Sequence, residues 1–212
     1  MPSGSMSRIN KMAGAESNGD PAKARVGMWL FLLSEILLFG GLFILYSVYR
    51  YRYPSDFHQG SQEMEVLWGT LNTILLQTSA LIMTLSVVAL QRGNRRLSIY
   101  LLMGTMVLGF FFLGIKGSEW WLKIKDGIYP KSPVLLARPK GQILYFSLYY
   151  AMTGLHGFHV FVGLCVLSVM WFFLLTGKVH SARVVPLENS GLYWHLVDII
   201  WIFLYPLFYL IA

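Results

Sequence analysis

Five long runs of apolar residues limit what this chain can fold into. They are separated by short polar segments and lie at residues 26–47, 67–90, 99–121, 142–175 and 192–212. A helix of about 20 apolar residues crosses the hydrocarbon core of a membrane, so each run is long enough to span it. The strands of a membrane barrel would be about half as long and would alternate apolar and polar residues. Because a bilayer offers no water to bond the backbone, the sequence predicts an all-α bundle of five transmembrane helices.

The composition also indicates a membrane protein. Of the 212 residues, 56% are hydrophobic and 13% are charged, and that charged share is about half of what a soluble domain carries. The formal net charge is +7, but the basic residues are spread over short loops at both ends of the predicted spans. We therefore expect membrane lipids with anionic headgroups, and no nucleic acid, as the partners of these charges.

The charges around the first run predict the orientation of the chain. Residues 1–25 are rich in Ser, Gly, Asn and charge and lack the apolar core of a signal peptide, which indicates a flexible N-terminal tail. Four basic residues precede the first run and two follow it, namely Arg8, Lys11, Lys23 and Arg25 before it and Arg50 and Arg52 after it. Because the first helix usually dominates, this favours an N-terminus inside, and five spans then place the C-terminus outside.

Ionisable residues inside the spans are the candidates for function, because a charge near the bilayer centre is costly and usually faces the bundle interior. At about 1.5 Å per helical residue, five of them lie at depths where they can meet. We predict that these five form a buried polar network, consisting of Glu35, His156, His159, His195 and Asp198. We expect Glu35 to be protonated or tightly hydrogen-bonded, with His156 and His159 as candidate partners.

Two further ionisable residues lie near the opposite end of the third run. Lys116 and Glu119 are three residues apart, so they face the same side of a helix. We interpret them as an outer helix-end ion pair whose lysine extends to the lipid headgroups.

The spacing of the histidines also raises the possibility of a metal or haem. His156 and His159 are three residues apart, as are His195 and Asp198, and imidazoles at this spacing can bind a metal or, between facing helices, a haem. A dinuclear carboxylate site would need repeated Glu-x-x-His pairs, which the sequence lacks. Hydrogen bonds between helices are the simpler interpretation. We therefore predict no catalytic, cofactor-binding or metal-binding residue in this chain.

Five segments, in order, resemble subunit III of the haem–copper oxidases. They are MWLFLLSEILLFGGLF with Glu35, TLNTILLQTSA, GFFFLGIKGSEW with Glu119, TGLHGFHVFVG with His156 and His159, and YWHLVDIIWIFLY with His195 and Asp198. The resemblance runs from about residue 25 to the C-terminus. The first two helices of the seven-helix mitochondrial form are missing, so the chain is similar to the shorter five-helix bacterial form.

The resemblance implies a non-catalytic subunit of a respiratory terminal oxidase in the bacterial cytoplasmic membrane. Such a subunit packs on the catalytic subunit I and supports its proton uptake, its stability and aerobic electron transport. Haem and copper are then expected in the partner subunits, and bound phospholipid is compatible with this chain. Two alternatives stay open: an accessory subunit of a nitric oxide reductase, and a haem-binding membrane electron carrier. The electron donor, cytochrome c or quinol, is set by other subunits.

Overall fold

The computed structural model describes residues 21–181 and 183–210, and this part of the chain is helical without any strand. The helices are α2 Pro21–Arg52, α3 Pro54–Gln62, α4 Val66–Gln91, α5 Arg95–Lys125, α6 Pro133–Leu136, α7 Lys140–Thr176 and α8 Val185–Tyr205, followed by the π-helical turn η1 Pro206–Leu210. Five of these helices are long and apolar enough to cross a membrane. The predicted fold class is therefore confirmed.

The helices extend beyond the apolar runs that predict them. The structure describes α2 from Pro21 onward, before the predicted start at residue 26, and α8 begins at Val185, before residue 192. Polar residues at a helix end do not interrupt the backbone ladder, so hydrophobicity alone places such ends too late. Residues 1–20 of the predicted flexible tail and the C-terminal Ala212 lie outside the described residues. The side of the membrane that each end faces stays a prediction.

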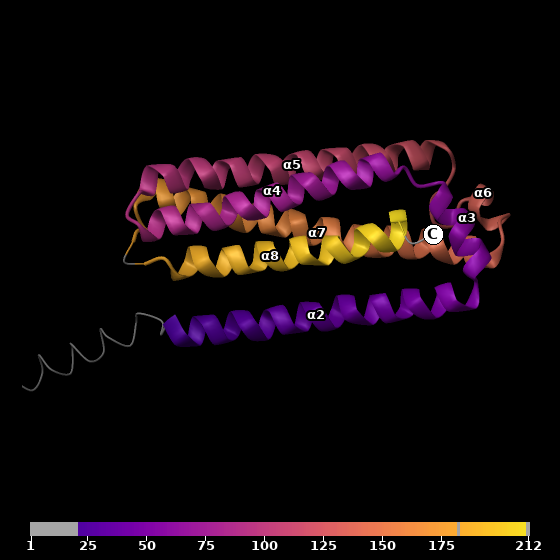
Figure 1. Cartoon of the computed structure of the whole chain (residues 1–212), viewed down its shortest axis with the longest axis horizontal. Coiled ribbons are helices and arrows are strands. Elements are labelled where there is room, and N and C mark those ends of the chain that lie inside the picture. Colours follow the sequence, from indigo (N-terminus) through magenta and orange to yellow (C-terminus); the bar gives the residue numbers. More distant parts are fainter. Residues whose placement is uncertain (1–20, 182, 211–212) are drawn as a thin grey trace, which may run out of the picture.

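Four of the five spans form the bundle, and the remaining one, α2, lies against its outside. In Figure 1, α4, α5, α7 and α8 pack together, whereas α2 runs along one edge beside α8. Only 11% of the apolar window of α2 is buried, against 56% for the last span. The first span is thus a peripheral helix, and α8 lies at the centre.

Two tryptophans of α8 fill the centre of the bundle. Trp194 and Trp201 are fully buried, and an indole N–H buried in an apolar core needs an acceptor. In each case α4 supplies a hydroxyl group: Trp194 Nε1 donates to Ser79 Oγ at 3.0 Å, and Trp201 Nε1 donates to Thr73 Oγ1 at 3.0 Å. These two bonds set the rotation of α8 against α4.

Short elements close one end of the bundle. The amphipathic helix α3 is tied to the start of α7 by Asp56 Oδ2, which accepts the N–H of Gly141 at 3.0 Å, and by Gln142 Nε2, which donates to Gln59 Oε1 at 2.8 Å. Arg138 forms an ion pair with Glu63 just after α3. The connection between α2 and α4 is therefore packed against α7 and is not a free loop.

We predict that Gly109→Ala destabilises the bundle while Gly114→Ala, on the same helix, does not. A Cβ atom at Gly109 would lie 2.8 Å from atoms of both Leu164 and Trp194, whereas one at Gly114 meets nothing within 4 Å. Overpacking of this kind costs about 1 to 3 kcal/mol. Thermal unfolding of the purified variants in detergent measures the difference, and equal melting temperatures would contradict it.

Candidate functional site

The ionisable pair nearest to mid-span joins α2 to α7. Glu35 Oε2 and His159 Nε2 are 2.8 Å apart, and the two side chains retain only 14% and 11% of their exposure. The other ring nitrogen, His159 Nδ1, lies 2.8 Å from the carbonyl oxygen of Leu155, one turn earlier on α7. Phe39 packs edge-on against the same imidazole. Of the two candidate histidines for Glu35, the structure thus selects His159.

This geometry limits where the hydrogens of the pair can lie. A carbonyl oxygen only accepts, so Nδ1 of His159 must carry a hydrogen. Nε2 then either donates to the Glu35 carboxylate as part of an imidazolium or accepts from the neutral Glu35 acid. In both descriptions the pair is neutral overall and holds a single proton between Glu35 Oε2 and His159 Nε2. The pair can therefore exchange a proton internally without changing its net charge.

His156 has different surroundings, although it is only three residues away. Its ring contacts both Phe112 and Trp201, with centroid distances of 5.6 and 5.2 Å, and these two rings also contact each other. It is fully buried, and neither ring nitrogen has a hydrogen-bond partner among the described residues. A step of three residues rotates a side chain by about 60° around the helix axis, which is enough to turn His156 into the bundle while His159 faces α2.

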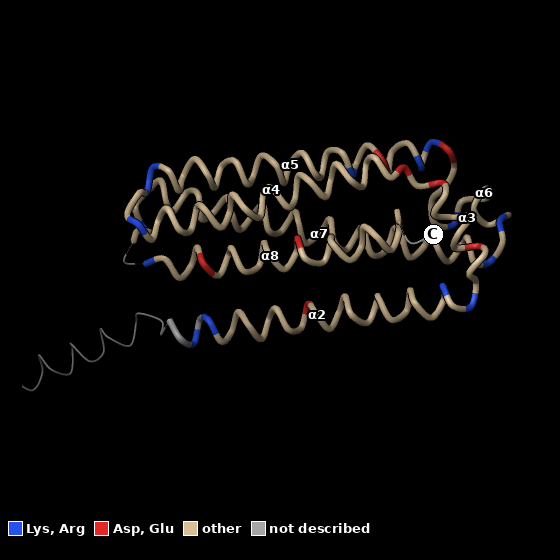
Figure 2. Tube along the Cα trace, in the orientation of Figure 1, with Lys and Arg blue, Asp and Glu red and all other residues tan. Residues whose placement is uncertain are grey.

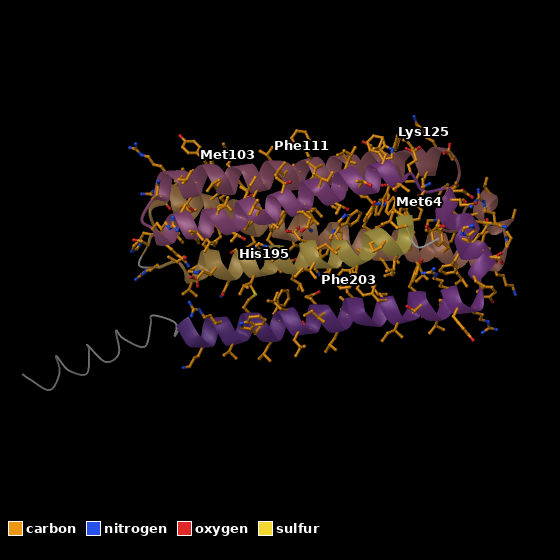
Figure 3. The ribbon with its side chains drawn as sticks, in the orientation of Figure 1. Met64, Met103, Phe111, Lys125, His195 and Phe203 are labelled. Carbon is orange, nitrogen blue, oxygen red and sulfur yellow. The ribbon has the colours of Figure 1, made fainter. Side chains whose placement is uncertain are left out.

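The residues His195 and Asp198 also differ in their hydrogen bonding. His195 Nε2 lies 3.2 Å from Thr84 Oγ1 of α4, and Figure 3 shows His195 on the half of α8 nearest to the start of α2. Asp198 is 2% exposed, and its two oxygens have no partner within the described part of the chain. The five residues predicted to form one network thus comprise one bonded pair, one histidine bonded to a threonine, and two unbonded side chains.

Lys116 and Glu119 form the predicted ion pair, but not at the surface. Nζ of Lys116 lies 3.1 Å from Glu119 Oε2, and both residues are 4% exposed. The same ammonium donates to Tyr149 Oη at 2.8 Å and to Tyr209 Oη at 2.6 Å, which uses all three of its hydrogens. The prediction that the lysine extends to the headgroups is therefore wrong. The bundle continues past this depth through η1, which covers the pair.

Both tyrosines complete this cluster by donating to the carboxylate. Tyr149 Oη lies 2.6 Å from Glu119 Oε1, and Tyr209 Oη lies 2.6 Å from the same oxygen. The sequence analysis missed both tyrosines. A hydroxyl group within an apolar span needs a polar partner, and that requirement is the signal that could have identified them. The cluster joins α5, α7 and η1 through saturated hydrogen bonds.

No group of three or more His, Cys, Asp or Glu side chains in residues 21–181 and 183–210 is arranged to hold a metal ion. Those described polar residues that have partners in other helices instead tie these helices together. Their arrangement is suited to fixing the positions of the spans and to holding a proton between α2 and α7.

Comparison with known proteins identifies the family. The family model described as cytochrome c oxidase subunit III matches residues 6–212, nearly the whole chain. The chain belongs to this family. The resemblance found in the five sequence segments is thereby confirmed.

Relatives of this subunit III family member come from different kinds of oxidase. The chain is 31% identical over 188 residues to cytochrome c oxidase subunit 3 of Thermostichus vulcanus, covering 88% of this chain and 87% of that one. It is 27% identical over 185 residues to cytochrome bo(3) ubiquinol oxidase subunit 3 of Buchnera aphidicola, covering 87% and 92%. It is also 28% identical over 195 residues to the heme-copper oxidase subunit I+III of Aeropyrum pernix, covering 89% of this chain but 23% of that longer protein.

We predict opposite effects for the same substitution at the two neighbouring histidines. His159→Phe removes the partner of Glu35 and should destabilise the protein by about 1 to 3 kcal/mol. His156→Phe keeps an aromatic ring against Phe112 and Trp201 and removes two nitrogens without a partner among the described residues, so it should cost nothing or stabilise. Melting temperatures of the two variants in the same detergent give the comparison. Equal losses would show that the Glu35–His159 contact does not hold α2.

We also predict that Lys116 and Glu119 depend on each other. Lys116→Met or Glu119→Gln alone leaves one buried charge uncompensated, and breaking a buried pair in this way costs about 3 to 5 kcal/mol. The double variant removes both charges and should be more stable than either single one. Unfolding of all three variants forms a double-mutant cycle, and additive losses would rule out the coupling.

Proposed function

We propose that the chain is the non-catalytic subunit III of a respiratory haem–copper terminal oxidase and packs on the catalytic subunit I. The observation that carries this proposal is the family match over residues 6–212. A relative named subunit I+III joins both subunits in one polypeptide, which supports their being neighbours in an assembly. Relatives named for cytochrome c and for ubiquinol leave both classes of electron donor within the proposal.

The Glu35–His159 pair supports a contribution to proton uptake and stability. It places a single shared proton inside the first and fourth spans, on the side of the bundle where α2 is mostly exposed. A proton held there can be passed between the two residues, and the same contact fastens the peripheral helix. The proposed location is the cytoplasmic membrane of a bacterium, with α2 to α8 crossing it five times.

The alternative of a haem-carrying electron carrier is less consistent with the surroundings of the histidines. His156 is fully buried against Phe112 and Trp201, and His159 is engaged on both nitrogens. Haem and copper are accordingly assigned to the partner subunits. An accessory role in a nitric oxide reductase would differ only in the identity of the catalytic partner.

Purification of the full-length chain through an affinity tag, from cells that make it naturally, tests the proposal. We expect a haem–copper oxidase subunit I to co-purify and the haem absorption to remain with that subunit when the two are separated. A Soret band that stays with this chain would contradict the assignment, as would co-purification with a nitric oxide reductase.

Two substitutions at Glu35 examine its proposed role in this assembly. Glu35→Gln keeps a hydrogen-bonding side chain beside His159 and should retain subunit I, whereas Glu35→Ala leaves His159 Nε2 unpaired at a cost of about 1 to 3 kcal/mol and should weaken retention. Subunit retention and oxygen reduction are measured for both. Full retention in the Ala variant would refute the tie between α2 and α7.

A further inference from the structure

A line of polar side chains runs along α4 from one end of the helix to the other. Its members are seven residues apart, so they lie on one side of the helix. They are Thr70, Gln77, Thr84 and Gln91. The first is partly buried and the other three are exposed. The line therefore lies on the surface of the bundle, although α4 crosses the membrane.

Side chains of α8 bond to three of these four positions. The pairs are Gln91–Glu188, Thr84–His195 and Thr70–Tyr205, with 2.9, 3.2 and 2.7 Å between the bonding atoms. The line thus follows the outer edge of the contact between α4 and α8. We call these three residues of α8 and the four residues of α4 the polar strip.

The polar strip has groups without partners at the middle of the membrane span. Gln77 lies within two residues of the centre of α4, and it is exposed. Its amide forms no hydrogen bond within residues 21–181 and 183–210. His195 bonds to Thr84 through Nε2, and its Nδ1 has no partner in the part of the chain that the structure describes. The strip therefore has hydrogen-bonding capacity that the described helices do not use.

Hydrocarbon is a poor covering for such a surface. An amide without a partner is costly in an apolar medium, and polar groups within spans usually face protein or water. Helix α4 contains no charged residue, and Figure 2 shows blue and red mainly toward the two ends of the bundle. The covering surface has to supply uncharged hydrogen-bonding groups at mid-depth, which lipid tails lack.

We propose that a transmembrane helix of the catalytic subunit I packs on the polar strip and carries hydrogen-bonding side chains at the level of Gln77 and His195. This rests on the proposed function, which makes subunit I the neighbour of this chain. Polar side chains that bond across helices hold membrane helices together. A helix suits the strip because a seven-residue spacing matches a neighbouring helix that crosses at about 20°.

Photo-cross-linking from two matched positions of the full-length chain tests this surface. p-Benzoylphenylalanine replaces either Leu81, which is 60% exposed and lies between Gln77 and Thr84, or Phe111 of α5, which is 59% exposed. Figure 3 shows Phe111 on the helix farthest from α2. Each tagged variant replaces the natural chain in its own cells, and the membranes are irradiated. We expect mass spectrometry to find subunit I joined to position 81 and not to position 111.

The variant Gln77→Leu provides a second readout. Leucine at an exposed position suits lipid at least as well as glutamine, so the isolated variant should keep its melting temperature. We expect its affinity for subunit I to fall about threefold to tenfold, which corresponds to one lost hydrogen bond between helices. Ser118→Ala, at an exposed position of α5, is the control and should leave that affinity unchanged.

Three results would overturn the proposal. Cross-linking of position 81 to a second copy of the chain would assign the polar strip to self-association. Equal cross-linking from positions 81 and 111, or no protein product from 81 while subunit I still co-purifies, would show that the strip is not the contact. Absence of subunit I from the wild-type preparation would contradict the proposed function itself, and the assignment of this surface would fail with it.

Discussion

The fold depends on one constraint, which is that polar groups inside a bilayer must find their partners within the protein. The indole N–H groups of Trp194 and Trp201 are satisfied by hydroxyl groups of α4. The turn η1 is held in the same way, because the hydroxyl groups of Tyr46 and Tyr145 donate to the carbonyl oxygens of Leu207 and Phe208. Each such bond therefore satisfies a buried polar group and also fixes how one helix is rotated against another.

The ionisable residues within the spans divide into groups with different physical states. The cluster of Lys116 and Glu119 with its two tyrosines is saturated, and this explains how two charges can be buried at 4% exposure. The Glu35–His159 pair is neutral in either protonation form and lies at the edge of the bundle. His156 and Asp198 are buried without a bonded partner in the described part of the chain. Contacts with the rings of Phe112 and Trp201 accompany the burial of His156.

Because α2 lies at the edge of the bundle, its few polar contacts are important for holding it in place. It is attached near its start by Arg25 and Glu188, in the middle by Glu35 and His159, and near its end by Tyr46. Apolar burial contributes less to its position than it does for α8, because most of the surface of α2 is exposed. A helix of this kind can contact a partner subunit or lipid along its outer side while the three ties keep its register with the bundle.

The sequence by itself determined the number of spans, their order and the set of polar residues inside them, because run length and composition decide what can cross a bilayer. It also indicated that Glu35 would bond to a histidine. It could not choose between His156 and His159 or foresee the inward turn of Lys116. These spans are apolar on every side, so hydrophobicity does not specify their rotation. Only the packing of Trp194, Trp201 and Tyr209 against neighbouring helices sets which side chains face inward, and that packing exists only in the tertiary structure.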